Sequence, residues 1–394
     1  MSWPADPVAA VTHPDPYPYY GALRARPLER HPGIGMWVAA RAADVGAVLA
    51  SDLCRVRPPA EPVPRAIVDT EAGSIFGRLV RMNDGPAHAA ARRVVAAALA
   101  SPRPADVRAT SRDLAHAQAA ALDLRHRPTR VMEVAFDVPA RVMGRLLGLE
   151  EALLDGVVAW TGDFVRGIAA GADADRRERG ARAAARLEQA LAARERQRGH
   201  GLLADLAREA ERAGGPALSV VVANALGFLS QPYEATAGLI GNALVTLSRD
   251  EALRRQVRAE PGRVADLVQE VLRHDPSTHN TRRYVARRGL VAGVEVDEGD
   301  AILVVLAAAN RDPELNREPD AFRLVRPDRR LLSFGHGPHA CPGDLLAGAI
   351  AGGVVEALLD ARVPLEDLAE TRRYLPSVNV RIPVFSAESG PAWI

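Results

Sequence analysis

Phe334-Gly-His-Gly-Pro-His-Ala-Cys-Pro-Gly343 is the stretch of sequence that decides the fold of this chain. Glycines at positions 335, 337 and 343 permit backbone conformations and close approaches that a Cβ atom would obstruct, as a loop pressed against a flat group requires. Cys341 stands at the end of this loop. Pro342 suits the first position of a helix, so we expect Cys341 at the helix cap, where the positive end of the helix dipole stabilises a thiolate.

Cys341 also has two simpler interpretations. A lone cysteine is more often a small buried hydrophobic residue than a ligand. His336, His339 and Cys341 could be zinc ligands, but they are only three, at an unfamiliar spacing and with no second pair elsewhere. The whole pattern closely resembles the haem-binding loop of the cytochrome P450 family, which implies a haem b cofactor with Cys341 as the iron ligand.

A second motif, Glu270-Val-Leu-Arg273, places two opposite charges on one face of a helix. Its place before the cysteine loop, followed by His274-Asp275-Pro276, makes it similar to the family's structural Glu-x-x-Arg pair. The resemblance implies that the pair docks the irregular segment before Cys341, with Arg326 as a candidate third partner. Breaking such a buried pair typically costs ~3–5 kcal/mol.

A third motif, Asp84-Gly-Pro-Ala-His88-Ala-Ala-Ala-Arg92, is similar to the family's His-x-x-x-Arg on the helix that holds the haem propionates. Four-residue spacing aligns both side chains on one face, where they can make charge-assisted hydrogen bonds to a carboxylate. A solvated arginine helix is the simpler interpretation. The resemblance implies the following haem-binding residues: His88, Arg92, Arg283, Phe334, Gly335, His339, Cys341 and Gly343.

The segment Ala237-Gly-Leu-Ile-Gly-Asn242 is much like the family's helix that passes over the oxygen site. This register puts Glu234 at the position of the usual acid, but Ala235 at that of the alcohol that helps to deliver protons. Thr236 comes one place later, about 100° around a helix. The usual proton relay is therefore in doubt. Protons could come from Glu234 through water, from Thr236 or from a polar group of the substrate.

Pro232 takes the place of the family's usual glycine in this helix. Proline removes the backbone donor that would bond the carbonyl of Phe228, so we expect the helix to bend or open there. Such an opening can admit water or oxygen. A merely tolerated kink is the simpler interpretation.

The resemblance implies an oxidoreductase that uses O2 and two electrons from a separate ferredoxin or flavodoxin, because no reductase or flavin segment follows the haem loop. Hydroxylation of a mid-sized natural product is the expected reaction. Three alternatives stay open: oxidative radical coupling that forms a C–C or C–N bond without oxygen insertion, direct use of peroxide, and a non-catalytic haem-protein partner of another enzyme. Retention of Cys341 and of the propionate residues argues against the last.

Substrate contacts are assigned only by position in the family. The segments expected to face the pocket are 57–80, 277–281 and 377–379, together with the distal helix. Polar groups in a mainly apolar pocket favour a substrate with several hydrogen-bonding groups over a fatty acid. The residues expected to contact the substrate are Gln231, Tyr233, His279 and Asn379.

Composition bounds the remaining classes of protein. Hydrophobic residues make up 48% and charged residues 25% of the 394 residues, as in ordinary globular proteins. A net charge of +1 gives no whole-chain argument for binding nucleic acid or an acidic membrane. Cys54 and Cys341 are too few for a disulfide framework, and we find no secretory signal or apolar run of bilayer length. We expect a cytoplasmic protein without membrane or nucleic-acid partners.

The sequence pattern predicts a mainly α chain with a minor β portion. One short helical patch lies within the proline-rich residues 14–36, and a strand leading into a helix follows directly. From about residue 87 to 275 apolar residues recur at helical spacing. Within that range, the arginine-rich and glutamate-rich segment 172–199 is expected to be a solvated helical face.

The last third of the chain has a different pattern. Residues 283–305 contain glycine-punctuated, β-branched segments that predict short strands. Four prolines between residues 310 and 340 predict a long ordered loop before Cys341. We expect one domain, residues 1–394, with the cytochrome P450-like fold of a helical bundle around a buried haem.

Overall fold

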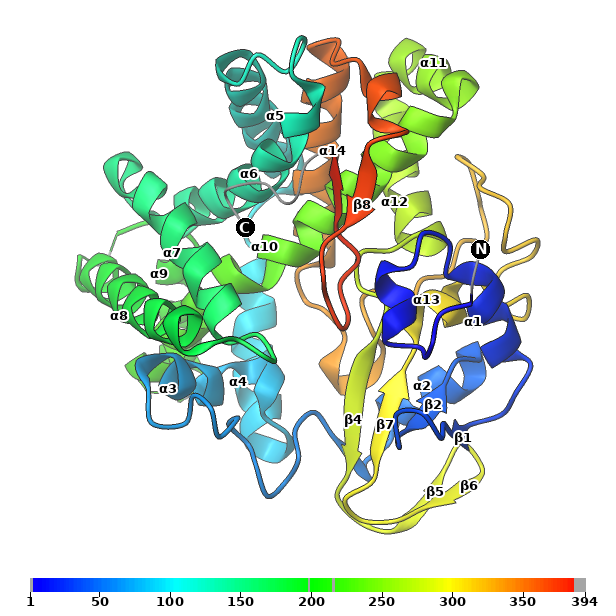
Figure 1. Ribbon diagram of the computed structural model, residues 1–394. Coiled ribbons are helices and arrows are strands. Elements are labelled where there is room, and N and C mark those ends of the chain that lie inside the picture. Colours follow the sequence, from blue (N-terminus) through cyan, green and yellow to red (C-terminus); the bar gives the residue numbers. More distant parts are fainter. Residues whose placement is uncertain (1–2, 198, 215–216, 386–394) are drawn as a thin grey trace. The chain divides into compact units, whose positions relative to one another are not determined.

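The computed structural model describes residues 3–197, 199–214 and 217–385 (Figure 1). The chain forms two compact units, and the single domain expected from the sequence stays a prediction. The first unit comprises Met1–Cys54, Arg108–Phe136 and Glu234–Ile394, and the second comprises Arg55–Val107 and Asp137–Tyr233. Each is described by itself.

The first unit contains the main sheet. Its strands run in the order β1 (Glu29–Arg30), β2 (Trp37–Ala39), β7 (Ala301–Val304), β4 (Thr281–Val285) and β3 (Cys54–Arg55). Strand β7 is parallel to β2 and antiparallel to β4, and β4 and β7 lie side by side in Figure 1. Apolar residues of this sheet and of helix α2 (Ala42–Ala50) form one core, which includes Val45, Val48, Cys54, Val285, Ile302 and Val304.

The first unit also contains two short hairpins and several helices. Two short hairpins pair β5 (Gly289–Val291) with β6 (Val294–Val296), and β8 (Arg372–Tyr374) with β9 (Pro383–Phe385). The helices are α1 (Tyr17–Arg24), α11 (Glu251–Ala259), α12 (Val264–His274), α13 (Leu306–Asn310) and α14 (Asp344–Asp360), with 3-10 turns η1 (Ala9–Thr12), η3 (Pro128–Arg130), η5 (Pro261–Arg263), η6 (Gly337–His339) and η7 (Leu365–Leu368).

The second unit is helical. It contains α3 (Glu71–Arg78), η2 (Val80–Met82), α4 (Gly85–Leu99), η4 (Glu151–Leu153), α7 (Leu154–Gly167), α8 (Ala174–Arg196) and α9 (Leu202–Arg212). Helices α7 and α8 meet at two glycines, because a Cβ atom on Gly167 would lie 2.7 Å from the Cα atom of Gly180. Three helices, α5 (Pro104–Ala121), α6 (Val131–Leu146) and α10 (Leu218–Arg249), have residues in both units.

The predicted architecture is confirmed in its main features. The chain is mainly helical, the strands between residues 283 and 305 are present, and the proline-rich segment before Cys341 has no regular structure until η6. The arginine-rich segment is the helix α8, in which Leu187 and Leu191 are buried while Arg179 and Arg182 are exposed, as expected for a solvated face.

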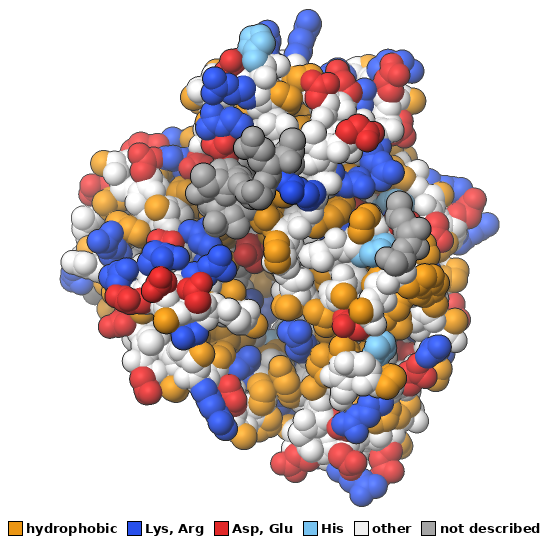
Figure 2. All heavy atoms as spheres, in the orientation of Figure 1, with side chains coloured by type: hydrophobic (Ala, Val, Ile, Leu, Met, Phe, Trp, Pro, Cys, Tyr) orange, Lys and Arg blue, Asp and Glu red, His pale blue; other side chains and the backbone are white. Residues whose placement is uncertain are grey.

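The face of the molecule shown in Figure 2 has no single-charge field. On the face shown in Figure 2, arginine and acidic side chains are interspersed. Within the described residues, no helix is both long enough and apolar enough to cross a membrane.

Candidate functional site

Cys341 lies on a loop that closes on itself between η6 and α14. Its backbone N–H donates to the carbonyl of Phe334 at 2.8 Å, and the N–H of Gly335 donates to the carbonyl of Leu332 at 2.8 Å. Gly335 and Gly337 adopt φ angles of 74° and 69°, in the left-handed region that favours glycine. The side chain of Cys341 is exposed, so its thiol is accessible to a ligand.

Gly337 also lies in close contact with the backbone at the end of α2. A Cβ atom at this position would lie 3.1 Å from the carbonyl oxygen of Leu49 at the end of α2. The glycine requirement expected from the sequence is therefore confirmed at positions 335 and 337. Gly343 has a φ angle of −107°, which other residues adopt readily, so its backbone does not require glycine.

The predicted cap position of Cys341 is wrong by two residues. Helix α14 begins at Asp344 with Gly343 as its N-cap, because Pro342 and Gly343 form a turn before the helix starts. The first helical hydrogen bond runs from the N–H of Ala347 to the carbonyl of Gly343 at 2.9 Å. Cys341 therefore precedes the helix, and the helix dipole acts on its thiolate from a greater distance than expected.

Two buried asparagines fix the segment that leads into the loop. Asn310, at the end of α13, accepts the N–H of Leu332 at 2.7 Å and donates to the carbonyl of Leu272 at 3.1 Å. The side-chain amide of Asn316 donates to the carbonyl of Arg330 and accepts the N–H of Arg330, both at 3.0 Å. The sequence analysis missed both asparagines. In the sequence they are polar residues in a proline-rich segment, and such residues are equally typical of a solvated loop.

Glu270 is the centre of a buried charge cluster. Its carboxylate and the side chain of Arg273 have no exposed area, and Nη2 of Arg273 lies 2.7 Å from Oε1 of Glu270. Arg326 contacts the same oxygen at 3.3 Å, which confirms the predicted third partner. Arg329 contacts Oε2 at 2.9 Å, and the backbone N–H of Arg323 donates to Oε1 at 3.0 Å.

This cluster ties α12 to the irregular segment before Cys341. Arg273 donates to the carbonyls of Pro319 and Ala321, and Arg326 donates to the carbonyls of Arg317 and Ala321. Burial alone would raise the pKa of Glu270, but its arginine and backbone partners outweigh burial and lower it. The carboxylate therefore stays ionised, and the role of the motif is architectural, as expected.

The residues expected to bind propionates are divided between the two units. In the second unit, His88 is buried on α4 and Arg92 follows one turn later on the same helix. In the first unit, Arg283 lies on β4 opposite Ile302 and donates to the carbonyl of Arg282 at 2.9 Å, and His339 ends η6. Their common role remains a proposal.

Helix α10 continues through Pro232, and its burial changes there. Residues 221–230 and 236–245 are all buried, whereas Gln231, Pro232, Glu234 and Ala235 are partly exposed. We call these four residues the α10 window. The loss of burial shows that this part of the helix borders open space, at the residues that the sequence places over the oxygen site.

Thr236 directly follows the α10 window. Its side chain is only 2% exposed, and within the described part of the chain it makes no hydrogen bond. The hydroxyl of Thr236 is therefore available to an additional group.

Gln231 and Tyr233 both pack against glycines of the second unit. A Cβ atom on Gly227 would lie 2.6 Å from Nε2 of Gln231, so this amide folds back along α10. A Cβ atom on Gly162 of α7 would lie 2.7 Å from the hydroxyl oxygen of Tyr233. Asn379, in the first unit, is half-buried and accepts the N–H of His279 at 2.9 Å through its carbonyl.

His279 has a different place from the one expected. Its side chain has no exposed area, and its Nδ1 is hydrogen-bonded to the hydroxyl of Tyr20 at 2.9 Å. Its Nε2 faces Oδ1 of Asp275 at 3.7 Å. Burial lowers the pKa of His279 to about 4. We therefore correct the assignment of His279 from a substrate contact to a structural residue.

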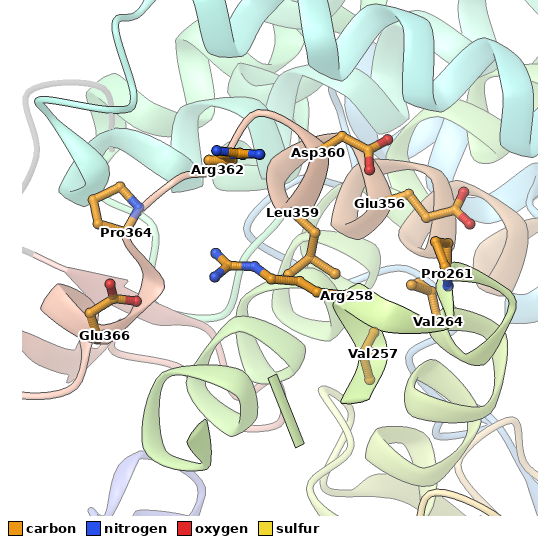
Figure 3. Close-up of a pocket in the computed structure, with 10 residues that line it drawn as sticks. All are labelled: Val257, Arg258, Pro261, Val264, Glu356, Leu359, Asp360, Arg362, Pro364 and Glu366. Carbon is orange, nitrogen blue, oxygen red and sulfur yellow. The ribbon is translucent and has the colours of Figure 1, made fainter. Parts of the chain in front are cut away.

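A separate open groove is lined by none of these residues. It has a volume of about 590 Å³ and lies between the end of α11, the start of α12 and the end of α14 (Figure 3). Charged side chains of both signs line it, including Arg258, Arg362, Glu356 and Asp360, and none is a residue that the sequence assigns to the site.

Comparisons with known proteins assign the family. A model of the cytochrome P450 family matches residues 216–360. Cytochrome P450 107B1 of Saccharopolyspora erythraea is 27% identical, over 86% of each chain. The mycinamicin IV hydroxylase/epoxidase of Micromonospora griseorubida is 28% identical, over 92% of this chain and 90% of its own. The crystal structure of CalO2 gives a TM-score of 0.79 at 29% identity, over 97% of this chain and 98% of that one.

The chain belongs to the cytochrome P450 family.

This P450 is therefore a haem-binding oxidoreductase, and its cysteine loop fits that cofactor. A haem iron takes one axial thiolate in this family, and the loop offers one accessible cysteine beside two glycines in left-handed conformation. Zinc requires several protein ligands. Among the described residues, no group of three histidine, cysteine or acidic side chains is placed to hold a metal ion, so the zinc interpretation has no support.

Proposed function

We propose that this P450 oxidises a mid-sized natural product, using O2 and two electrons from a separate ferredoxin or flavodoxin, with an atypical distal proton supply. The observation that carries the proposal is the α10 window, in which Ala235 is partly exposed at the position of the usual alcohol. Hydroxylation is the favoured outcome. The mycinamicin IV hydroxylase/epoxidase, 28% identical, is a relative that acts on a natural product.

The cofactor in this proposal is haem b. Cys341 would be the axial ligand, with Phe334, Gly335 and Gly343 forming its loop and His88, Arg92, Arg283 and His339 binding the propionates. When bound, the haem supplies dioxygen activation, which thiolate ligation favours. The exposed thiol of Cys341 and the fixed backbone of its loop support this assignment.

The protein's part is to deliver protons and to hold the substrate. Glu234 is partly exposed in the α10 window, so it can exchange protons with water. Thr236 offers a hydroxyl group without a partner in the described chain, which can pass a proton from Glu234 or orient water. Gln231, Tyr233 and Asn379 remain proposed substrate contacts.

Restoring the alcohol tests the proton supply. With any accepted substrate, the variant Ala235→Thr should form more product per electron consumed than the wild type, because a second hydroxyl completes the relay. Thr236→Val, which keeps the side-chain shape, should form less. Unchanged coupling of electron use to product in both variants would refute the atypical proton supply.

Oxidative radical coupling, which forms a C–C or C–N bond without oxygen insertion, is the second candidate. Turnover under ¹⁸O₂ separates the two reactions. Hydroxylation places one labelled oxygen atom in the product, whereas coupling leaves the product unlabelled.

The electron donor is proposed to dock on the unit that carries Cys341. Leu345, four residues after the cysteine, is 69% exposed, and Val325 is 55% exposed. Arg330 has a fixed backbone and an exposed side chain, which suits attraction of an acidic partner. Arg330→Gln should raise the KM for the donor at low salt, whereas Arg179→Gln on α8 should leave it unchanged.

A further inference from the structure

The groove shown in Figure 3 is built entirely from the first unit. Its walls are the end of α11, the 3-10 turn η5, the start of α12, the end of α14 and the turn that follows α14. Its apolar lining includes Val257, Val264 and Leu359, which are at most 6% exposed. A volume of about 590 Å³ lies within the range of small-molecule sites. The groove therefore has the room and the apolar surface to hold an organic molecule.

Two acidic side chains of the groove are paired with arginines that do not line it. Nε of Arg108 donates to Oε2 of Glu356 at 2.9 Å, and Nη2 of Arg108 donates to Oε1. Nε of the buried Arg254 lies 3.6 Å from Oε2 of Glu366. Both carboxylates therefore have a cation of their own.

The two arginines that line the groove have no such counter-charge. Among the residues that the structure describes, neither Arg258 nor Arg362 forms an ion pair. Nη2 of Arg258 makes one long hydrogen bond, at 3.5 Å to the carbonyl of Val363. The remaining acid, Asp360, lies 3.8 Å from Nε2 of His116, which is charged only when protonated. The groove thus has two positive charges against at most one negative charge that is not already paired.

The two unpaired cations belong to one place in the groove. Val363 directly follows Arg362, so the contact of Arg258 with the Val363 carbonyl brings both arginines to the turn after α14. Figure 3 shows both guanidinium groups at the edge of the same open space. Two like charges held near each other repel, and an anion that joins them removes this cost.

Arg362 also occupies a backbone position at which glycine is favoured. Its φ angle is 54°, and its N–H donates to the carbonyl of Leu359 at 3.1 Å. The N–H of Val363 donates to the carbonyl of Leu358 at 3.1 Å, which completes the C-terminal turn of α14. The left-handed residue of this turn is usually glycine, because a Cβ atom disfavours the conformation. The backbone therefore gives no reason for a long cationic side chain at position 362, whereas the groove does.

We propose that this groove is a second ligand site, which binds an organic carboxylate between Arg258 and Arg362. An arginine can hold a carboxylate through two parallel hydrogen bonds. One carboxylate supplies a single negative charge, which balances the groove when Asp360 is counted, and the apolar lining covers the rest of the molecule. The inference is independent of the proposed oxidation, because no residue that lines the groove is a proposed haem or substrate contact.

The test uses straight-chain carboxylates from butanoate to octanoate as probes, each with its primary amide as the uncharged control. Isothermal titration calorimetry of the holoenzyme gives the dissociation constants, and a shift of the Soret band reports any probe that enters the haem pocket. At one or more chain lengths, the wild type should bind the acid at least about tenfold more tightly than the amide, as expected for charge-assisted hydrogen bonds. The same acid should raise the unfolding temperature more than its amide does.

Three variants assign this preference for the acid. Arg258→Gln and Arg362→Gly should each abolish it. Arg362→Gly also relieves the left-handed backbone, so without ligand its unfolding temperature should not fall, and a loss of binding then reports the missing side chain. Arg255→Gln is the matched control, because Arg255 lies on α11 outside the groove lining and pairs with Glu251. It should leave the preference unchanged.

The contrary outcomes overturn the inference. Equal affinity for acid and amide at every chain length would show that the groove is not a carboxylate site. A preference retained in either Arg258→Gln or Arg362→Gly would contradict a site made by both arginines. A preference that accompanies a Soret shift and survives in both variants would place the carboxylate in the haem pocket. None of these results bears on the proposed oxidation, which turnover under ¹⁸O₂ tests separately.

Discussion

Nε of Arg381 lies 3.3 Å from Oδ1 of Asp275, and the side chain of Arg381 is 2% exposed. The hydroxyl of Tyr17 donates to the same carboxylate oxygen at 2.6 Å. Arg381 also donates to the carbonyls of Val11 and His13 at 2.9 and 2.7 Å. One buried ion pair therefore fastens the start of the chain to its last third.

This ion pair should contribute strongly to the stability of the first unit. Arg381→Met leaves the buried carboxylate of Asp275 without its cation and three backbone carbonyls without their donor, so we expect the free energy of unfolding to fall by about 3–5 kcal/mol. Arg372→Met is the matched control, because both arginines lie near the ring of Tyr374. The guanidinium of Arg372 is 5.7 Å from the ring centre and that of Arg381 is 3.5 Å from it. The control should cost less than about 1 kcal/mol in urea unfolding. Equal losses would contradict the assignment.

The buried histidines should make stability depend on pH. Burial lowers the pKa values of His274 and His279 to about 4, from an ordinary 6.5. Between these values the unfolded chain binds more protons than the folded chain, so stability is fully present above pH 6.5 and is lost as the pH falls towards 4. His279→Gln should reduce the slope by about 1.4 kcal/mol per pH unit in this window, as measured by urea unfolding at several pH values. His200→Gln, at an exposed histidine, should not change the slope.

Variants at two partners of Glu270 separate the contributions of a side chain and of a backbone N–H to the free energy of unfolding. Arg326→Gln removes a buried cation from the carboxylate and should lower the free energy of unfolding by about 3–5 kcal/mol. Arg323→Gln should have little effect, because Arg323 bonds Glu270 through its backbone N–H while its side chain is exposed. Thermal unfolding and haem content measure both effects. A similar loss in the two variants would mean that surface charge, rather than the buried cluster, holds the segment.

Gly238 marks a close contact on α10. A Cβ atom there would lie 2.8 Å from the carbonyl oxygen of Arg381 and 2.8 Å from Cβ of Ser277. Gly238→Ala should therefore displace these two segments and cost about 1–3 kcal/mol by overpacking. Gly46→Ala is the matched control in helix α2, where nothing lies within 4 Å of the added atom. It should stabilise the protein by about 0.5–1 kcal/mol, and a loss of stability there would contradict the packing argument.

Local pattern was enough to predict much of this protein. Glycine at 335 and 337 marked left-handed backbone, and the spacing of Glu270 and Arg273 marked a pair on one helix face, because both features depend on neighbours in sequence. The helical majority and the short strands followed from periodicity in the same way.

Long-range contacts escaped prediction. Tyr17 and Asp275 are 258 positions apart, and no local pattern in either segment predicts the hydrogen bond between them. The burial of His279 follows from that cluster, so a family position alone assigned it wrongly.

The absorption spectrum of the purified protein, reduced and exposed to carbon monoxide, tests the central claim most directly, in the wild type and in Cys341→Ala. A strongly red-shifted Soret band in the wild type that is lost in the variant is the result expected for haem held by the Cys341 thiolate. A wild type without bound haem, or with a band that the substitution leaves in place, would contradict the account.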